Sequence, residues 1–265
     1  MATEKAITAF GSRIYGLGVV ALAMVCLAWG SFDPGQPVPK DFPGRIVLAY
    51  AAAVFMLVAG AVIEWRRTAA WGAAVLAAYY AFIVVVLMNG RIVLAHYAEY
   101  GSYSGAAEQL AIAAGGLIVY AASASRIDAA QAARLTHVGQ LTFAVCALLF
   151  GGAHFFYMNL TAPLVPHWLP PSQEFWAYAT GFAHIAAGIA ILTGVQARLA
   201  AVLLTIMYAS FTPLVHLPML LADPSSHWIW SENALNIALT GVAWVVADSL
   251  ACNYSSKRTH LSHDT

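Results

Sequence analysis

The chain has 265 residues, of which 61% are hydrophobic and only 9% are charged, and its formal net charge is zero. A soluble domain carries about 25% charged residues, so this composition excludes a soluble globular protein and indicates an integral membrane protein. The balance of twelve basic and twelve acidic residues gives no reason to expect nucleic acid as a partner. The three cysteines lack CxxC spacing, which argues against a disulfide framework and a thiolate metal site.

Apolar runs along the chain are long enough to form membrane-spanning helices, each of which needs about 20 apolar residues. They predict about eight spans, centred near Val20, Val54, Ala78, Gly115, Cys146, Ile185, Ile206 and Leu239. Two proline-rich segments, 31–45 and 159–174, follow the first and fifth spans. Proline at that density disfavours helix, so both are expected to be extended surface segments.

The sequence also contains an internal duplication. The run that begins at Ala49 aligns without gaps with the run that begins at Ala177, and the two share the glycines Gly60 and Gly188. An even number of spans per repeat predicts two parallel four-helix repeats. The expected division is residues 1–125 as a scaffold repeat, 126–252 as a repeat with intramembrane histidines, and 253–265 as a cytoplasmic tail.

The distribution of positive charge predicts the orientation. If the amino terminus is inside, nine Lys and Arg residues fall on the cytoplasmic side and three on the outer side. Both termini are therefore expected in the cytoplasm, with the protein in the plasma (inner) membrane.

Three histidines, His154, His184 and His216, lie within the fifth, sixth and seventh predicted spans. Ionisable groups in the hydrocarbon core are costly, so each needs a partner or a function. The spacing of Gly181, His184 and Gly188 places His184 on a face of small residues, where another helix can approach closely.

Polar residues at helical spacing on the last two spans are expected to face the same layer as these histidines. They are Thr205, Tyr208, Thr212 and His216 on the seventh span and Glu232, Asn233, Asn236 and Thr240 on the eighth. Polar side chains of all four helices of the second repeat would then converge near its outer face.

Three kinds of site fit this convergence. Facing imidazoles can hold a transition metal such as copper, iron or zinc, with Glu232 as a further ligand, or they can bind the iron of haem b. A buried histidine and Asn236, beside Thr212, can instead donate hydrogen bonds to a quinone and relay a proton. A structural role is the fourth alternative, in which His216 only bonds the Thr212 hydroxyl.

Residues of the predicted outer loops are less specific. His96, His167 and His227 are expected at the surface, although each is close enough in the topology to join the site. The aromatic residues Trp168, Phe175, Trp176, Trp228 and Trp230 are typical of a membrane-interface belt, or form a docking face for a soluble redox partner.

The segment PHWLPPSQEFWAYATGFAHIAAGIAIL, a short turn with Arg198, and RLAAVLLTIMYA together resemble the DoxX-like family of four-helix membrane proteins, over about residues 138–251. The resemblance implies a four-helix bundle and an association with redox pathways such as quinone-linked thiosulfate oxidoreductases, and it supplies no catalytic residues.

The sequence thus predicts an all-α integral membrane protein that is redox-associated and binds a metal or haem through His154, His184 and His216. The alternatives are a non-catalytic anchor or assembly subunit for a soluble or quinone-linked oxidoreductase, and a protein that binds a quinone or small solute. Whether the chain is part of an enzyme, and whether it forms a homo-oligomer, is left open.

Overall fold

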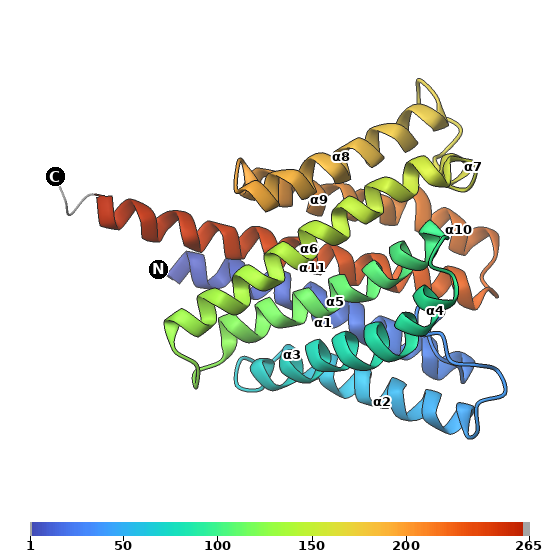
Figure 1. The fold of residues 1–265 in the computed structure, drawn as a ribbon, viewed down its shortest axis with the longest axis horizontal. Helices are drawn as coiled ribbons and strands as arrows, with labels where there is room; N and C mark the ends of the chain where they lie inside the picture. The colour runs from blue at the N-terminus through green and yellow to red at the C-terminus, as the bar shows by residue number, and fades with distance from the viewer. Residues whose placement is uncertain (1, 262–265) are drawn as a thin grey trace.

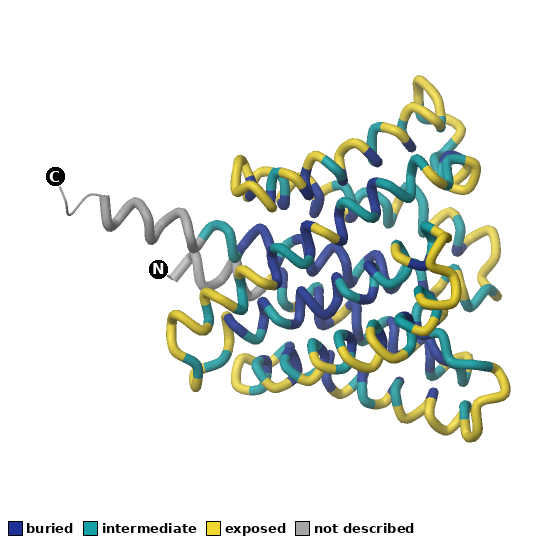
Figure 2. Tube along the Cα trace, viewed as in Figure 1, coloured by how far each residue is buried: buried dark blue, intermediate teal, exposed yellow. Residues whose placement is uncertain are grey.

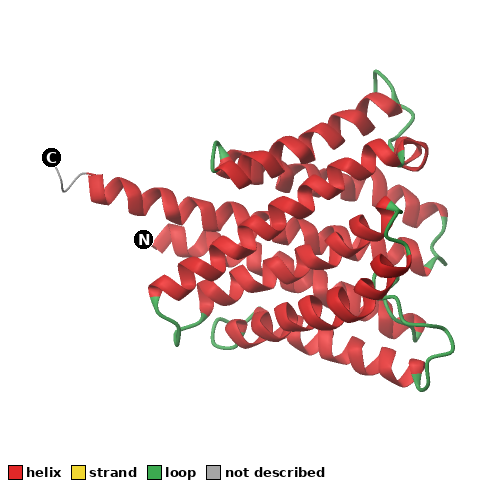
Figure 3. Cartoon of the chain, viewed as in Figure 1, coloured by secondary structure: helices red, strands yellow, loops and turns green. Residues whose placement is uncertain are grey.

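The computed structural model describes the backbone of residues 2–261 and the side chains of residues 10–251. All regular structure in that part of the chain is helical, and no strand occurs there (Figure 3). Eight helical segments of the described chain are long and apolar enough to cross a membrane, which confirms the number predicted from the apolar runs. The protein is therefore treated as an integral membrane protein that spans a lipid bilayer.

The helices follow one another in the order of the predicted spans. The first four spans are α1 (Ala2–Trp29), α2 (Arg45–Ile63), the continuous set α3 (Ala69–Ala78), π-helix η1 (Tyr79–Asn89) and α4 (Gly90–Ala95), and α5 (Tyr100–Ser123). The last four are α6 (Ala129–Phe156), α8 (Gln173–Thr193), the set α9 (Ala197–Phe211), π-helix η3 (Thr212–His216) and α10 (Leu217–Ala222), and α11 (His227–Leu261). The short helices α7 (Met158–Thr161) and η2 (Ala162–Leu164) lie between α6 and α8, and α11 continues into the segment predicted as a tail.

Four helices, α1, α5, α6 and α11, form the centre of the bundle (Figure 1). α1 packs along α11 and α2, whereas α6 packs along α5 and α8. The α2 and α3 helices lie on one side of this centre, and α8 and α9 lie on the other. Burial is greatest in the central helices and least in these outer ones (Figure 2). The exposed apolar side chains of the outer helices form a surface suited to lipid.

Small residues allow α1 and α11 to cross in close contact. A Cβ atom added to Gly18 would lie 2.4 Å from backbone atoms of Ala238, and one added to Gly241 would lie 2.2 Å from the backbone nitrogen of Tyr15. Small residues at such crossings let backbones approach and increase van der Waals contact, which is the main attraction between helices in lipid. The first and last spans thus belong to one core.

The proline-rich segment between α1 and α2 folds inward. Asp33 and Gln36 are only 6% and 1% exposed. The Gln36 amide nitrogen donates to the Met56 sulfur at 3.3 Å, and its Oε1 accepts from the Tyr79 hydroxyl at 3.0 Å. The expectation of a surface segment is wrong for this part of the loop, because α2 and η1 supply partners for its polar side chains.

Candidate functional site

Glycines at the crossing of α6 and α8 bring two of the predicted histidines together. A Cβ atom on Gly181 would lie 2.9 Å from the Cβ of His154, and one on Gly151 would lie 3.1 Å from the Cβ of His184. The two imidazole centroids are 5.3 Å apart, and His184 is 3% exposed. The prediction that His184 lies on a small-residue face against another helix is confirmed.

Hydrogen bonds from Nδ1 orient both imidazoles. The Nδ1 of His154 lies 3.0 Å from the carbonyl oxygen of Ala177, and the Nδ1 of His184 lies 2.8 Å from that of Thr180. Because a carbonyl oxygen only accepts, Nδ1 carries the proton, and Nε2 of each neutral ring is an acceptor. Neither Nε2 takes part in a hydrogen bond within the described side chains. The rings therefore present acceptors, whereas the quinone alternative drawn from the sequence relies on a histidine that donates.

A cavity of about 600 Å³ lies beside this histidine pair. Its wall is mostly apolar and comes from α5, α6, α8, α9, η3, α11 and the loop that precedes α8. The ionisable and amide side chains on the wall are Glu108, His154, His184, Tyr208, His216, Glu232 and Asn236. Cavities of about 300–1,000 Å³ with an apolar lining and a few convergent polar groups are typical of small-molecule sites.

His216 lines the same cavity without joining the histidine pair. The side chain of the seventh span that lies beside His184 is Tyr208, with 5.4 Å between ring centroids. His216 ends the π-helix η3, two helical turns further on, and its buried Nδ1 has no partner among the described residues. Within the described chain, no group of three or more His, Cys, Asp or Glu residues is placed to hold a metal ion. The structure thus brings together two of the three predicted ligands.

Asn236 and Thr212 hold the seventh span against α11. The Asn236 amide nitrogen donates to the carbonyl oxygen of Tyr208 and to the Thr212 hydroxyl, both at 3.0 Å. Pro213 has no N–H to offer to the preceding turn, so the amide supplies a donor where the helix lacks one. Of these two residues, Asn236 lines the cavity and Thr212 does not. The amide nitrogen of Asn236 is already engaged in the two hydrogen bonds to the seventh span.

Two acidic residues reach the cavity from different halves of the chain. Glu232 lies on the wall from α11, so it is more than a surface residue near a helix start. Glu108 reaches the same cavity from α5, in the half that the sequence assigned to scaffold. Glu108 is the lone charged residue of the α5 run, and an isolated carboxyl in an intramembrane helix is the signal that could have identified it.

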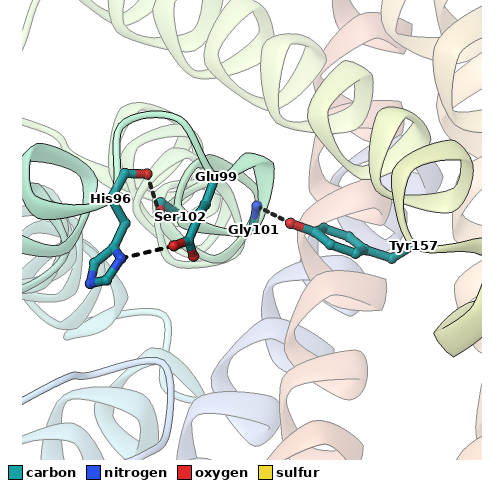
Figure 4. A network of polar contacts seen from close by, with 5 residues as sticks. All are labelled: His96, Glu99, Gly101, Ser102 and Tyr157. Atoms are coloured by element: carbon teal, nitrogen blue, oxygen red, sulfur yellow. Dashed lines mark hydrogen bonds and ion pairs between the residues drawn. The ribbon is translucent and has the colours of Figure 1, made fainter.

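His96 lies outside the cavity, at the exposed start of the segment that leads into α5. Its Nδ1 is 3.0 Å from Oε1 of Glu99 (Figure 4). Beside it, the backbone N–H of Gly101 donates to the Tyr157 hydroxyl at 2.8 Å (Figure 4). This contact ties the end of α6 to the start of α5 and so fixes the two helices that carry His154 and Glu108.

The other two outer histidines also lie off the cavity wall. His167 is exposed, and the His227 ring stacks on Trp29 with 5.3 Å between centroids. Trp168, Phe175, Trp228 and Trp230 are exposed, as an interface belt requires. Trp176 differs from them because it lines the cavity, and its indole N–H donates to the carbonyl oxygen of Pro170 at 2.8 Å.

Comparison with known proteins gives one similarity. The model of a family described as a domain of unknown function (DUF8561) matches residues 143–247. This stretch begins within α6, ends within α11, and contains His154, His184, His216 and Glu232. No curated protein and no solved structure matches the chain.

Proposed function

We propose that the protein binds a lipophilic hydroquinone, or the corresponding quinone, in the cavity beside His154 and His184. One observation carries the proposal: two neighbouring imidazoles, each held at Nδ1 by a backbone carbonyl, offer Nε2 acceptors beside a mostly apolar cavity of about 600 Å³ within membrane-spanning helices. A hydroquinone matches these features, because it carries hydroxyl donors on an aromatic ring and partitions into lipid.

The rest of the wall suits a ligand with a second polar end. Glu108 and Glu232 reach the cavity from α5 and α11, and the Tyr208 hydroxyl is buried without a partner among the described residues. A ring with oxygens at opposite ends can bond an imidazole at one end and a carboxyl at the other. The apolar wall, including Leu169 and Phe211, takes the ring faces and the start of a tail.

A two-repeat organisation belongs to the same proposal, with residues 1–125 and 126–252 as the repeats. Helix positions support it: α2 begins at Arg45 and α8 at Gln173, while α3 begins at Ala69 and α9 at Ala197, so both pairs are 128 residues apart. The packing of α1 on α11 and of α6 on α5 supports an exchange of first and last helices between the repeats. The resemblance to DoxX-like proteins supports a redox-associated role, and the excess of Lys and Arg supports cytoplasmic termini in the inner membrane.

The repeats differ where the ligand is proposed to bind. At the 128-residue spacing, Met56 corresponds to His184 and Tyr80 to Tyr208. In the first half the Tyr80 hydroxyl donates to the Met56 sulfur at 3.2 Å, and Gln36 packs on the same sulfur. Polar partners fill that position, whereas the second half has a cavity beside His184 and Tyr208. This difference supports a ligand site in the second repeat and a structural role for its counterpart.

Quinol binding to the purified protein in lipid nanodiscs tests the proposal. Trp176 lines the cavity, so decylubiquinone and its reduced form should change its fluorescence on binding, and Trp176→Phe should lose most of that change. His154→Phe and His184→Phe keep an aromatic ring and remove the Nε2 acceptor. Each should weaken binding of the reduced form about tenfold, the equivalent of about 1.4 kcal/mol for one lost hydrogen bond.

His137→Phe is the matched control, because His137 is exposed on the same helix, α6, and does not line the cavity. It should bind like the wild type. Absence of saturable fluorescence change with either form of the probe, or equal effects of the His137 and His154 substitutions, would contradict the proposal.

A metal or haem on the histidine pair is the second candidate function. The observation that favours it is the same Nδ1 geometry, because metal-bound histidines usually donate their other N–H to a carbonyl or carboxylate. Elemental analysis and absorption spectra of oxidised and dithionite-reduced protein distinguish the candidates. A Soret band would indicate haem. A metal site would be indicated by stoichiometric copper, iron or zinc in the wild type that is lost in His154→Phe and His184→Phe.

A further inference from the structure

Three carboxyl groups gather at the wall between the cavity and the first half of the chain. Glu108 of α5 and Glu232 of α11 lie on the cavity wall, and Asp33 lies behind them in the loop after α1, where it is 6% exposed. The loop that carries Asp33 packs on α5 next to Glu108, because a Cβ atom on Gly35 would lie close to both Asp33 Oδ1 and the Nε2 of Gln109. Electrostatic coupling of Glu108 to Glu232 and Asp33 agrees with this arrangement. Together they are called the carboxyl trio.

No Lys or Arg of the described chain forms an ion pair with the trio. Two arginines, Arg45 and Arg91, contact the loop after α1 and bond other groups of that loop. Arg45 of α2 bonds the Ser31 hydroxyl and the Val38 carbonyl, and Arg91 of α4 bonds the Pro37 carbonyl. Three ionised carboxylates close together in a low-dielectric region would repel one another strongly, and no positive side chain offsets that repulsion.

The remaining titratable groups around the trio come from every element that packs on it. They are Cys26 of α1, Tyr79 and Tyr80 of η1, and the cavity residues His154, His184, Tyr208 and His216, whereas His227 of α11 stacks on Trp29. Tyr79 and Tyr80 already donate to Gln36 and Met56, and the His154 and His184 Nδ1 protons are held by carbonyls. None of these groups supplies a fixed positive charge.

Buried polar atoms beside Asp33 lack partners within the described chain. They are Oδ2 of Asp33 itself, the hydroxyl of Ser231, which is 3% exposed, and Nε2 of Gln109, which is 1% exposed. A Cβ atom on Gly35 would lie 2.1 Å from the Gln109 Nε2 and 2.9 Å from the Asp33 Oδ1, so the amide is directed at the Asp33 loop. The Ser231 hydroxyl and the Gln109 amide are donors, and Oδ2 of Asp33 can accept from them, so this side of the trio has hydrogen-bonding capacity that the described side chains leave unused.

We infer that Asp33, Glu108 and Glu232 hold at least one shared, exchangeable proton at neutral pH and deliver it as a hydrogen bond to the ligand in the cavity. The second part rests on the proposed function: the histidine pair accepts from one hydroxyl of a hydroquinone, and a protonated Glu108 or Glu232 donates to the oxygen at the other end. The first part stands on the arrangement of the trio and does not depend on the identity of the ligand.

Infrared difference spectroscopy of the nanodisc-embedded protein tests the shared proton directly. Wild-type protein at pH 7 should show the carbonyl stretch of protonated carboxylic acid, with the small downshift that exchange into D₂O causes. Asp33→Asn, Glu108→Gln and Glu232→Gln should each change the intensity or frequency of this band. Glu174→Gln, at an exposed position on α8, should leave it unchanged.

Wild-type protein with no protonated-acid band at pH 7 would overturn the inference, whatever the variants do. A band that appears only when sodium is replaced by choline would also overturn it, in favour of a bound cation. Glu174→Gln changing the band as much as Glu232→Gln would assign the signal to other carboxyls and refute the trio.

Decylubiquinone binding separates this inference from the proposed function. If the probe binds, Glu108→Gln and Glu232→Gln should each alter its affinity about threefold or more. In the wild type, binding of the probe should also shift the frequency of the protonated-acid band. A band at pH 7 without any probe binding would leave the shared proton standing and reject the quinone. Probe binding without the protonated-acid band would support the quinone site and reject the shared proton.

Discussion

Substitution of Gly241 by alanine tests the packing of the first span on the last. The added Cβ would lie 2.2 Å from the backbone nitrogen of Tyr15 and 2.5 Å from its Cα. Backbone atoms cannot rotate away, so α1 and α11 must separate by about 1.2 Å to restore an ordinary contact of about 3.4 Å. Overpacking of this kind costs about 1–3 kcal/mol, and the rigid backbone on the other side places Gly241→Ala near the upper end.

The matched control is Gly105→Ala on α5, because nothing lies within 4 Å of a Cβ at that position. Alanine is a better helix former than glycine, so this variant should gain about 0.5–1 kcal/mol. Reversible unfolding in mixed micelles, titrated with SDS and followed by tryptophan fluorescence, measures both changes. The expected difference between the two variants is about 3–4 kcal/mol. If Gly241→Ala were as stable as Gly105→Ala, the close crossing of α1 and α11 would be refuted.

Three further predictions use the same measurements. Asn236→Leu removes both hydrogen bonds of the amide to the seventh span and should cost about 1–3 kcal/mol, while Asn233→Leu, whose Oδ1 has no partner among the described residues, should cost less. Burial raises the pKa of Asp33, so the folded state binds the proton more tightly than the unfolded chain, whose aspartate pKa is about 4. The free energy of unfolding therefore falls as the pH rises from about 4 through the raised pKa of the folded state. Asp33→Asn should remove this fall and should be more stable than the wild type at pH 8. Asp41→Asn, at an exposed position of the same loop, should behave like the wild type. Gly151→Ala should force α6 from α8, where its Cβ would lie 2.8 Å from the Gly181 carbonyl oxygen, and should weaken decylubiquinol binding about tenfold, so unchanged binding would refute the role of this crossing.

The sequence predicted those features that depend on a single helix. Apolar length identified eight spans, and the glycine spacing around His184 identified the face that packs on another helix. The polar stripe on the seventh span also lies inward, with Thr205 8% and Tyr208 3% exposed. Each of these follows from periodicity along one helix, which the sequence contains in full.

Features that depend on two or more elements were missed. Tyr208 rather than His216 lies beside His184, because the depth at which helices cross decides which residues meet, and the π-helix at Thr212 changes the register. The inward fold of the loop at Asp33 and the arrival of Glu108 at the cavity depend on packing between the two halves. The Nε2 atoms of His154 and His184 are acceptors because backbone carbonyls bind the Nδ1 protons, and no pattern of residue types predicts those carbonyl contacts.

The contact between α1 and α11 also bears on how the protein is made. Six spans lie between α1 and α11 in the sequence, so these spans must enter the membrane before the face with Tyr15 and Gly18 is covered by α11. A chain cut before His227 would leave that face in contact with lipid or with insertion factors. The core formed by α1 and α11 is therefore completed only after α11 has been inserted, and fragments of the two halves should be stable only when they are produced together.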